Sequence, residues 1–353
     1  MFQRILVPLD GSDGAERAIP VAARIARASG GSIVFIRVVP PPAEVGTFGT
    51  GVHGTIAMKP EVEASEKEFA DATNYLVTVI TAYVDELAGI ATETDVATGA
   101  ASSTIFSTAG YEYVDLIVMC SHGETGLKRW VFGSVAQQAV RHSPVPVLVL
   151  NEHGVVPPVP DAAHPLRILV PLDGSELAES ALEPATQLIA ALTAPAQGEL
   201  HLLRVVDLPS AYGKMKSQAY ISDGVQEEAR KEAEAYVKAV ADRLYETTFA
   251  TGKLNITSSA AVSTDVAGTI IKLAEQTEGD ESSSCDLIAI ATHGRGGLRR
   301  MVMGSVTEHL LGSTRLPLLI VRPHEAEMKG EEPGEAIAVK RTEVESQTWP
   351  GLL

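Results

Sequence analysis

Two aspartates occupy the same position in two copies of a repeated segment, and that position is suited to binding a ligand. The same nine residues, RILVPLDGS, run from Arg4 to Ser12 and again from Arg167 to Ser175. Each copy places an aspartate, Asp10 or Asp173, directly after an apolar run that is typical of a buried strand. A carboxylate in that place can accept hydrogen bonds from the hydroxyl or amino groups of a nucleoside, or it can cap the helix that follows. The two interpretations are compatible.

A second repeated segment is rich in glycine. It reads HGETGLKRWVFGSV at 122–135 and HGRGGLRRMVMGSV at 293–306. Glycine lets backbone N–H groups approach an oxyanion closely, and a helix that begins at GSV adds its positive end, so we interpret both segments as phosphate-binding loops. The alternative is a pair of tight turns. The candidate phosphate ligands are Gly123, Gly126, Gly133, Ser134, Gly294, Gly297, Gly304 and Ser305.

Histidine and cysteine residues beside these loops have simpler interpretations. His122 and His293 each precede a loop glycine and can contact a phosphate or donate a proton, but a side chain bonded to nearby backbone is the favoured interpretation. Cys120 ends an apolar run and is expected to fill the core. The sequence has no GxxxxGK[ST] loop and no Ser–His–Asp or zinc pattern, so we assign no catalytic residue and no metal ligand.

The elements that must position these residues alternate between strands and helices. Amphipathic segments, with apolar residues at three- and four-residue spacing, separate short apolar runs. This alternation predicts an α/β fold of two tandem doubly wound five-stranded parallel sheets with helices on both faces. Pro20 and Pro184 lie in the first helices, where we expect a kink or a late start. The predicted strands are 4–9, 32–39, 93–98, 115–120 and 146–150, then 167–172, 199–206, 255–262, 286–291 and 317–321.

Length, repeat and composition predict the organisation of the chain. We expect one domain at 1–151, a proline-rich linker at 152–165, a second domain at 166–323 and a disordered polar tail at 324–353. A net charge of −17 argues against sequence-independent binding of nucleic acid. No apolar run reaches the roughly 20 residues of a membrane helix, and no secretory signal pattern opens the sequence, so we expect a soluble, cytoplasmic protein with reduced cysteines.

Both halves resemble the universal stress protein family over nearly their whole length. The resemblance rests on VPLDGS at the start of each half, on DLIVMCSHG or DLIAIATHG in its middle, and on GSV followed by a final PVLVL or PLLIV strand. ATP-binding members carry G-x2-G-x9-G-[ST], which here begins with Cys120 and Ala291 in place of the first glycine. We expect the larger Cys120 side chain to obstruct its loop more than Ala291 does.

The resemblance implies an adenine nucleotide α-hydrolase-like fold with an ATP site in each half. Asp10 and Asp173 would contact the adenosine end, while the loop glycines and serines would hold the phosphates, which carry Mg²⁺. Pocket walls would include Val38, Val205, Met119 and Ile290. The remaining expected contacts are Pro8, Leu9, Cys120, His122, Val135, Pro171, Leu172, Ala291, His293, Arg295 and Val306.

The function implied by the resemblance is nucleotide sensing in a stress response. Two alternatives stay open: a slow ATPase or another adenine-nucleotide enzyme of the same architecture, and a dimerisation module that binds nothing. The resemblance also implies pairing of the final strands, 147–150 and 318–321, within the chain as a pseudo-dimer, or between two chains as a homodimer. We expect the second site to be the tighter one, because its loop carries Arg295, Arg299 and Arg300 where the first carries Glu124, Lys128 and Arg129.

Overall fold

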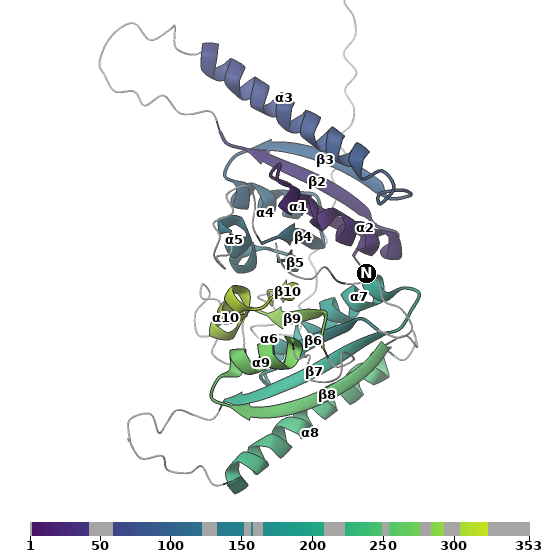
Figure 1. Ribbon diagram of the computed structural model, residues 1–353, viewed down its shortest axis with the longest axis vertical. Helices are drawn as coiled ribbons and strands as arrows, with labels where there is room; N and C mark the ends of the chain where they lie inside the picture. The colour runs from purple at the N-terminus through teal and green to yellow at the C-terminus, as the bar shows by residue number, and fades with distance from the viewer. Residues whose placement is uncertain are drawn as a thin grey trace, which may run out of the picture. The chain divides into compact units, whose positions relative to one another are not determined.

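A computed structural model gives the structure of the chain and describes residues 2–41, 59–121, 133–151, 157, 165–207, 223–248, 254–275, 284–292 and 304–323. Strands and helices alternate through this part, as the sequence predicts (Figure 1). Contacts group residues 1–323 into one unit. The predicted disordered tail at 324–353 lies outside the described residues, as does most of the linker. No described helix combines the length and the apolar character needed to cross a lipid bilayer.

The first half contributes five parallel strands to the sheet. They are β1 (Arg4–Pro8), β2 (Ser32–Val39), β3 (Ala91–Thr98), β4 (Leu116–Cys120) and β5 (Val147–Leu150). Their order is β3-β2-β1-β4-β5, so the chain moves outward in both directions from β1. The strand order reverses beside β1, which is the place where sheets of this kind bind ligands.

The second half repeats this arrangement. Its strands are β6 (Arg167–Pro171), β7 (Gly198–Asp207), β8 (Leu254–Ser263), β9 (Leu287–Ala291) and β10 (Leu318–Val321). They are parallel to one another in the order β10-β9-β6-β7-β8. Each predicted strand in both halves is present, with bounds within two residues of those expected.

The two halves join through their final strands. β5 and β10 are antiparallel, with Leu148 opposite Leu319, so the two five-stranded halves form one ten-stranded sheet. This is the pairing within the chain that the sequence led us to expect. Asn151 strengthens the joint, because its side-chain amide donates to the backbone oxygens of Thr314 and Leu316 at 2.8 and 3.1 Å.

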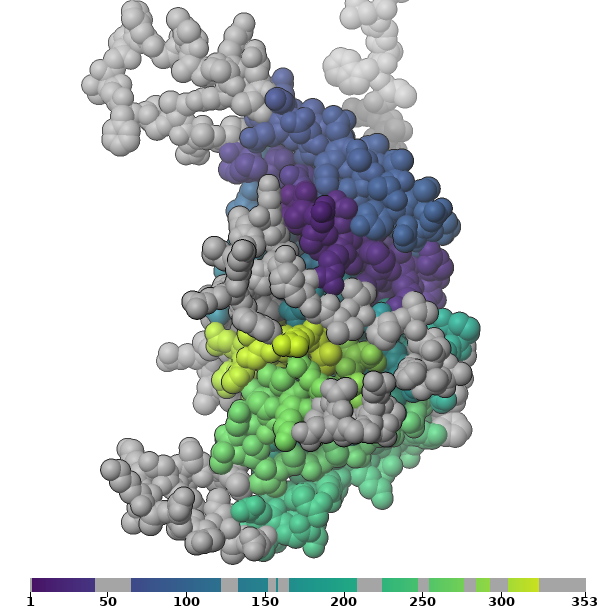
Figure 2. All heavy atoms as spheres, viewed as in Figure 1, coloured from purple at the N-terminus to yellow at the C-terminus, as the bar shows by residue number. Residues whose placement is uncertain are grey.

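Helices cover both faces of the sheet, and each face has one core that runs through both halves. One face carries α1 (Asp13–Glu16), α2 (Ala18–Ser29), α3 (Lys59–Ala82), α6 (Glu176–Glu179), α7 (Leu182–Thr193) and α8 (Asp223–Thr248). The other carries α4 (Ala101–Tyr111), α5 (Ser134–His142), α9 (Val266–Glu275) and α10 (Ser305–Ser313). α3 contacts β3 and α8 contacts β8, and their surfaces are blue and teal in Figure 2.

The two prolines start their helices late, as expected. The first helical turn, α1, is separate from α2, and Pro20 is the third residue of α2. Pro184 holds the same place in α7. Proline is tolerated there because the first N–H groups of a helix have no intrahelical partner. Gly30 then ends α2 in the left-handed conformation, with φ +66°.

Candidate functional site

A cavity of about 290 Å³ lies at the carboxyl ends of β1, β2 and β4, on the face covered by α4 and α5. Every described residue that the sequence analysis assigned to the first site lines it: Pro8, Leu9, Asp10, Val38, Met119, Cys120, Gly133, Ser134 and Val135. The lining also includes residues that the sequence analysis missed: Ala15, Ile36, Ala101, Ile105, Ser121 and Ala136. The cavity therefore has mostly apolar walls, one carboxylate and the first turn of α5.

Asp10 fixes the turn that leads from β1 into α1. Its Oδ1 accepts hydrogen bonds from the backbone N–H and the hydroxyl of Ser12, at 3.0 and 2.7 Å. The hydroxyl oxygen of Ser12 in turn accepts from the N–H of Ala15 at 3.2 Å and caps α1. Ser12 is therefore the helix cap, and Asp10 fixes the position of Ser12 through hydrogen bonds. One carboxylate oxygen is committed to the turn.

The second half builds the same turn. Asp173 Oδ1 accepts from the N–H and the hydroxyl of Ser175 at 3.0 and 2.6 Å, and Ser175 caps α6 through the N–H of Ala178 at 3.2 Å. Gly11 and Gly174, between the aspartate and the serine, have φ of +93° and +84°. Side chains rarely adopt that backbone conformation, which explains the glycine in both copies of LDGS.

An arginine, a tyrosine and a glutamate support the first turn from the opposite face of the sheet. The Arg37 guanidinium lies against Gly11, because a Cβ built on Gly11 would be 2.5 Å from its Nη1. The same guanidinium stacks on the Tyr75 ring, 4.9 Å from its centroid. The Tyr75 hydroxyl donates to Glu16 at 2.9 Å. Burial, followed by this hydrogen bond, raises the pKa of Tyr75, so the phenol keeps its proton and remains a donor.

The second half has an equivalent group. Arg204 stacks on Tyr236 at 4.7 Å, and the Tyr236 hydroxyl donates to Glu179 at 2.7 Å. The sequence analysis missed both groups. The available signal was the arginine before the pocket valine in both halves, in IRVV at 36–39 and LRVV at 203–206.

Cys120 and Ala291, which replace the first motif glycine, end buried strands β4 and β9. The Cys120 thiol is directed at the backbone oxygen of Ala15, 3.9 Å away, and packs in the core beneath α1 and α2. Met119, the preceding residue, faces the α4 and α5 side. Ala291 packs in the same core as Cys120. Cys120 also lines the cavity, so the greater obstruction expected from its side chain stays a prediction.

Two glycines begin the helices at the proposed phosphate ends. Gly133 is the N-cap of α5 and Gly304 is the N-cap of α10, and neither cap supplies a side-chain hydrogen bond. Their own N–H groups donate to the backbone oxygens of Ser121 and Thr292, at 2.8 and 3.0 Å. The first-turn N–H groups of α5 lie at the cavity wall, where the positive end of a helix attracts an anion.

The second half places the corresponding residues at matching positions. Asp173 follows β6, Val205 lies in β7, Ile290 and Ala291 end β9, and Gly304 precedes α10. Pro171, Leu172, Ser305 and Val306 adjoin them. The remaining predicted site residues lie outside the described part of the chain: His122, Gly123, Gly126, His293, Gly294, Arg295 and Gly297. So do the loop charges Glu124, Lys128, Arg129, Arg299 and Arg300.

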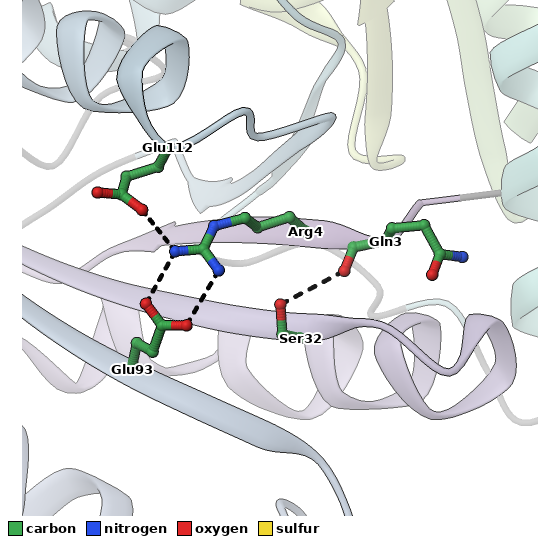
Figure 3. A network of polar contacts seen from close by, with 5 residues as sticks. All are labelled: Gln3, Arg4, Ser32, Glu93 and Glu112. Atoms are coloured by element: carbon green, nitrogen blue, oxygen red, sulfur yellow. Dashed lines mark hydrogen bonds and ion pairs between the residues drawn. The ribbon is translucent and has the colours of Figure 1, made fainter. Parts of the chain in front are cut away.

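A separate polar cluster lies at the amino ends of the first-half strands (Figure 3). Arg4 donates two hydrogen bonds to Glu93, at 3.0 and 2.8 Å, and one to Glu112 at 2.5 Å. Beside it, the Ser32 hydroxyl donates to the backbone oxygen of Gln3 at 3.4 Å. The hydrogen bonds to Glu93, the larger cause, and to Glu112 raise the pKa of Arg4. The cluster ties β1 to β3 and α4, away from the cavity.

Comparison with known proteins places these features in a family. Residues 1–151 and 166–322 match the universal stress protein family. A universal stress protein of Mycobacterium tuberculosis is 26% identical over 214 residues, which cover 59% of this chain and 62% of that protein. The solved universal stress protein of Archaeoglobus fulgidus aligns with a TM-score of 0.58 at 18% identity, covering 90% of this chain and 98% of that one. Another universal stress protein, solved in complex with cAMP, is 21% identical, covers 43% of this chain and 98% of its own, and has a TM-score of 0.28.

Proposed function

Because the chain belongs to the universal stress protein family, we propose that it binds ATP and acts as a nucleotide-dependent sensor or regulator of the stress response. The observation that carries the proposal is the cavity, because all described residues assigned to the first site from sequence line it. The proposal includes the division into a first domain at 1–151 and a second at 166–323, each with its own site.

The first-half cavity has the parts that a nucleotide needs. Val38, Met119 and Ile105 offer apolar walls for a base, and Asp10 offers a carboxylate to hydroxyl groups. The N-terminus of α5 faces the cavity and offers its N–H groups and its positive end to phosphates, which would bring Mg²⁺ with them. A volume of about 290 Å³ is near the lower end of the roughly 300–1,000 Å³ usual for ligand pockets. The enclosed part of the ligand would be the nucleoside.

Calorimetric titration of the full chain with ATP and Mg²⁺ tests the proposal, with Val38→Phe and Val205→Phe as matched variants. Each substitution adds bulk at the base wall of one site, so each is expected to remove binding to its own half and leave the other half intact. Circular dichroism checks that the variants fold. If the folded wild type gives no heat at millimolar ATP, the proposal is wrong for both halves.

A second candidate function is a dimerisation module without a ligand, which the β5–β10 joint favours. Native mass spectrometry of the purified chain separates it from the sensor, since only the sensor retains a nucleotide mass. Phosphate release would be measured on the same sample. Sustained release that Gly304→Asp abolishes would instead indicate a slow ATPase.

A further inference from the structure

The ten-stranded sheet has two outer strands, β3 and β8 (Figure 1). The two strands differ in charge. β3 contains Glu93 and Asp95 within ATETDVAT. β8 contains no charged residue in its ten residues, LNITSSAAVS. Within the described part of the chain, no strand pairs with the outer side of either. Edge strands are usually protected from other chains by charges, prolines or bulges. Charge protects β3 in this way, whereas β8 carries no charge.

β8 is also long and regular. It pairs with β7 along its whole length, from Leu254 opposite Gly198 to Ser263 opposite Asp207. Ten residues exceed the usual strand length of about five or six. An unbroken ladder on the inner side leaves a correspondingly long row of outward backbone groups, since alternate residues of an edge strand direct their N–H and C=O groups away from the sheet.

Polar side chains of β8 are bonded inward rather than over the edge. The Thr257 hydroxyl donates to Glu199 Oε1 at 2.8 Å, and Thr257 Oγ1 lies 2.8 Å from His201 Nδ1. Ser259 Oγ lies 2.9 Å from His201 Nε2. Since the Thr257 proton goes to Glu199, Nδ1–H donates to Thr257 and Nε2 accepts from Ser259. These contacts hold β8 against β7 and leave its outer backbone as the polar surface.

We propose that β8 is a self-association edge, through which two copies of this chain pair antiparallel and extend the sheet. The chain already uses this kind of joint, because its two similar halves meet by antiparallel pairing of the uncharged strands β5 and β10. Two copies with a net charge of −17 repel each other, so an uncharged edge is where they can approach. The acidic edge β3 would set like charges against each other.

The residue pattern of β8 is compatible with such a pair. With Ser258 opposite its own copy, Leu254 falls opposite Val262, and Ile256 falls opposite Ala260. Leu254 and Ile256 pack against the core that α8 covers, so all four of these residues lie on one face of the extended sheet. Apolar cross-strand pairs of this kind stabilise an antiparallel ladder. Ser258 is exposed and stands at the two-fold centre.

Sedimentation velocity of the full chain over a wide concentration range tests the proposal. The wild type is expected to form dimers that strengthen as added salt screens the net charge. Ser258→Glu places two like charges face to face at the centre and should weaken the dimer by about tenfold or more. Thr94→Glu is the matched control at an exposed position of β3, and it should leave the dimer unchanged.

Disulfide trapping gives a second, independent measurement. Ser258→Cys should yield a covalent dimer under mild oxidation and Thr94→Cys should not, while the native Cys120 and Cys285 are buried. A wild type that stays monomeric at every concentration overturns the proposal. So does a dimer that resists Ser258→Glu, that dissociates with Thr94→Glu, or that Ser258→Cys fails to trap.

Discussion

The two halves of this chain are more alike at the carboxyl ends of their strands than at the amino ends. At the carboxyl ends, the aspartate, glycine and serine of the turn recur with hydrogen bonds that agree within 0.1 Å, from 3.0 and 2.7 Å in one half to 3.0 and 2.6 Å in the other. The arginine, tyrosine and glutamate behind the turn recur as well. At the amino ends, Arg4 binds Glu93 and Glu112, whereas Arg167 pairs with Glu199.

One position shows the divergence most clearly. Val34 in β2 is opposite Leu6, and His201 in β7 is opposite the matching Leu169. The valine is buried among apolar side chains, while the histidine bonds Thr257 and Ser259. Many arrangements can hold the amino end of a sheet together, whereas a turn that presents a carboxylate to a cavity tolerates few. The turn beside the proposed site is therefore among the parts kept in both halves.

The largest expected effect concerns His201 and the dependence of stability on pH. Burial, with the nearby Arg167 charge adding to it, lowers the pKa of His201 to about 4. Between pH 6.5, the ordinary pKa of histidine, and pH 4, His201 is protonated in the unfolded chain but neutral in the folded chain. The free energy of unfolding therefore decreases as the pH falls through that range. The loss attributable to His201 should total roughly 3 kcal/mol.

Urea melts of the wild type and of His201→Gln at pH 7 and pH 4 measure it. The variant keeps a polar side chain without titrating in this range, so its stability should fall less between the two values. The first half has Val34 at this place and contributes no such term. Equal losses in the two proteins would remove the contrast between the amino ends.

The second prediction tests whether the turns at the carboxyl ends of the two halves are equivalent. Gly11→Ala forces a side chain into φ +93° and against Arg37, and Gly174→Ala forces one into φ +84°. Each should cost about 2 kcal/mol of stability and abolish ATP binding in its own half. Gly30→Ala is the control, because its φ is +66° but nothing lies within 4 Å of the new Cβ, so only the backbone strain remains. Thermal melts and calorimetry of the three variants check this. A much smaller cost at Gly174 would show that the two turns are not equivalent.

The smallest effect ranks the two proposed sites. Gly133→Asp and Gly304→Asp each place a carboxylate at the start of one helix, α5 or α10. Arg295 replaces Glu124 in the second loop, a difference of two charge units. At about 8 Å and an effective dielectric of roughly 40, each unit contributes on the order of 1 kcal/mol against one phosphate charge, and less in salt. Titration with ATP should show that Gly304→Asp removes the site that is tighter by about tenfold. Loss of the tighter site in Gly133→Asp would reverse the ranking.

Sequence predicted the strands well because buried parallel strands are short, apolar and bounded by turn residues. It placed β3 two residues late, since Ala91 and Thr92 carry no apolar pattern. The repeated motifs and the family resemblance gave part of the cavity lining, whereas residues of α4 such as Ala101 and Ile105 were missed. Tyr75 could not be found in that way, because only the packing of α3 brings it to Arg37. His201 was missed because its partners lie on the next strand and depend on register.

The joint between β5 and β10 has a consequence for synthesis. The ribosome completes β5 first, and β10 follows about 170 residues later, which at roughly 5–20 residues per second takes on the order of ten seconds. During that time the nascent first half displays an apolar strand, Val147–Leu150, whose partner does not yet exist. Nascent chains on neighbouring ribosomes of the same mRNA expose the same strand. Once β10 emerges, it is covalently linked to β5 and its effective concentration beside β5 exceeds that of any neighbouring chain. Pairing of β5 with β10 is therefore favoured over pairing with another chain.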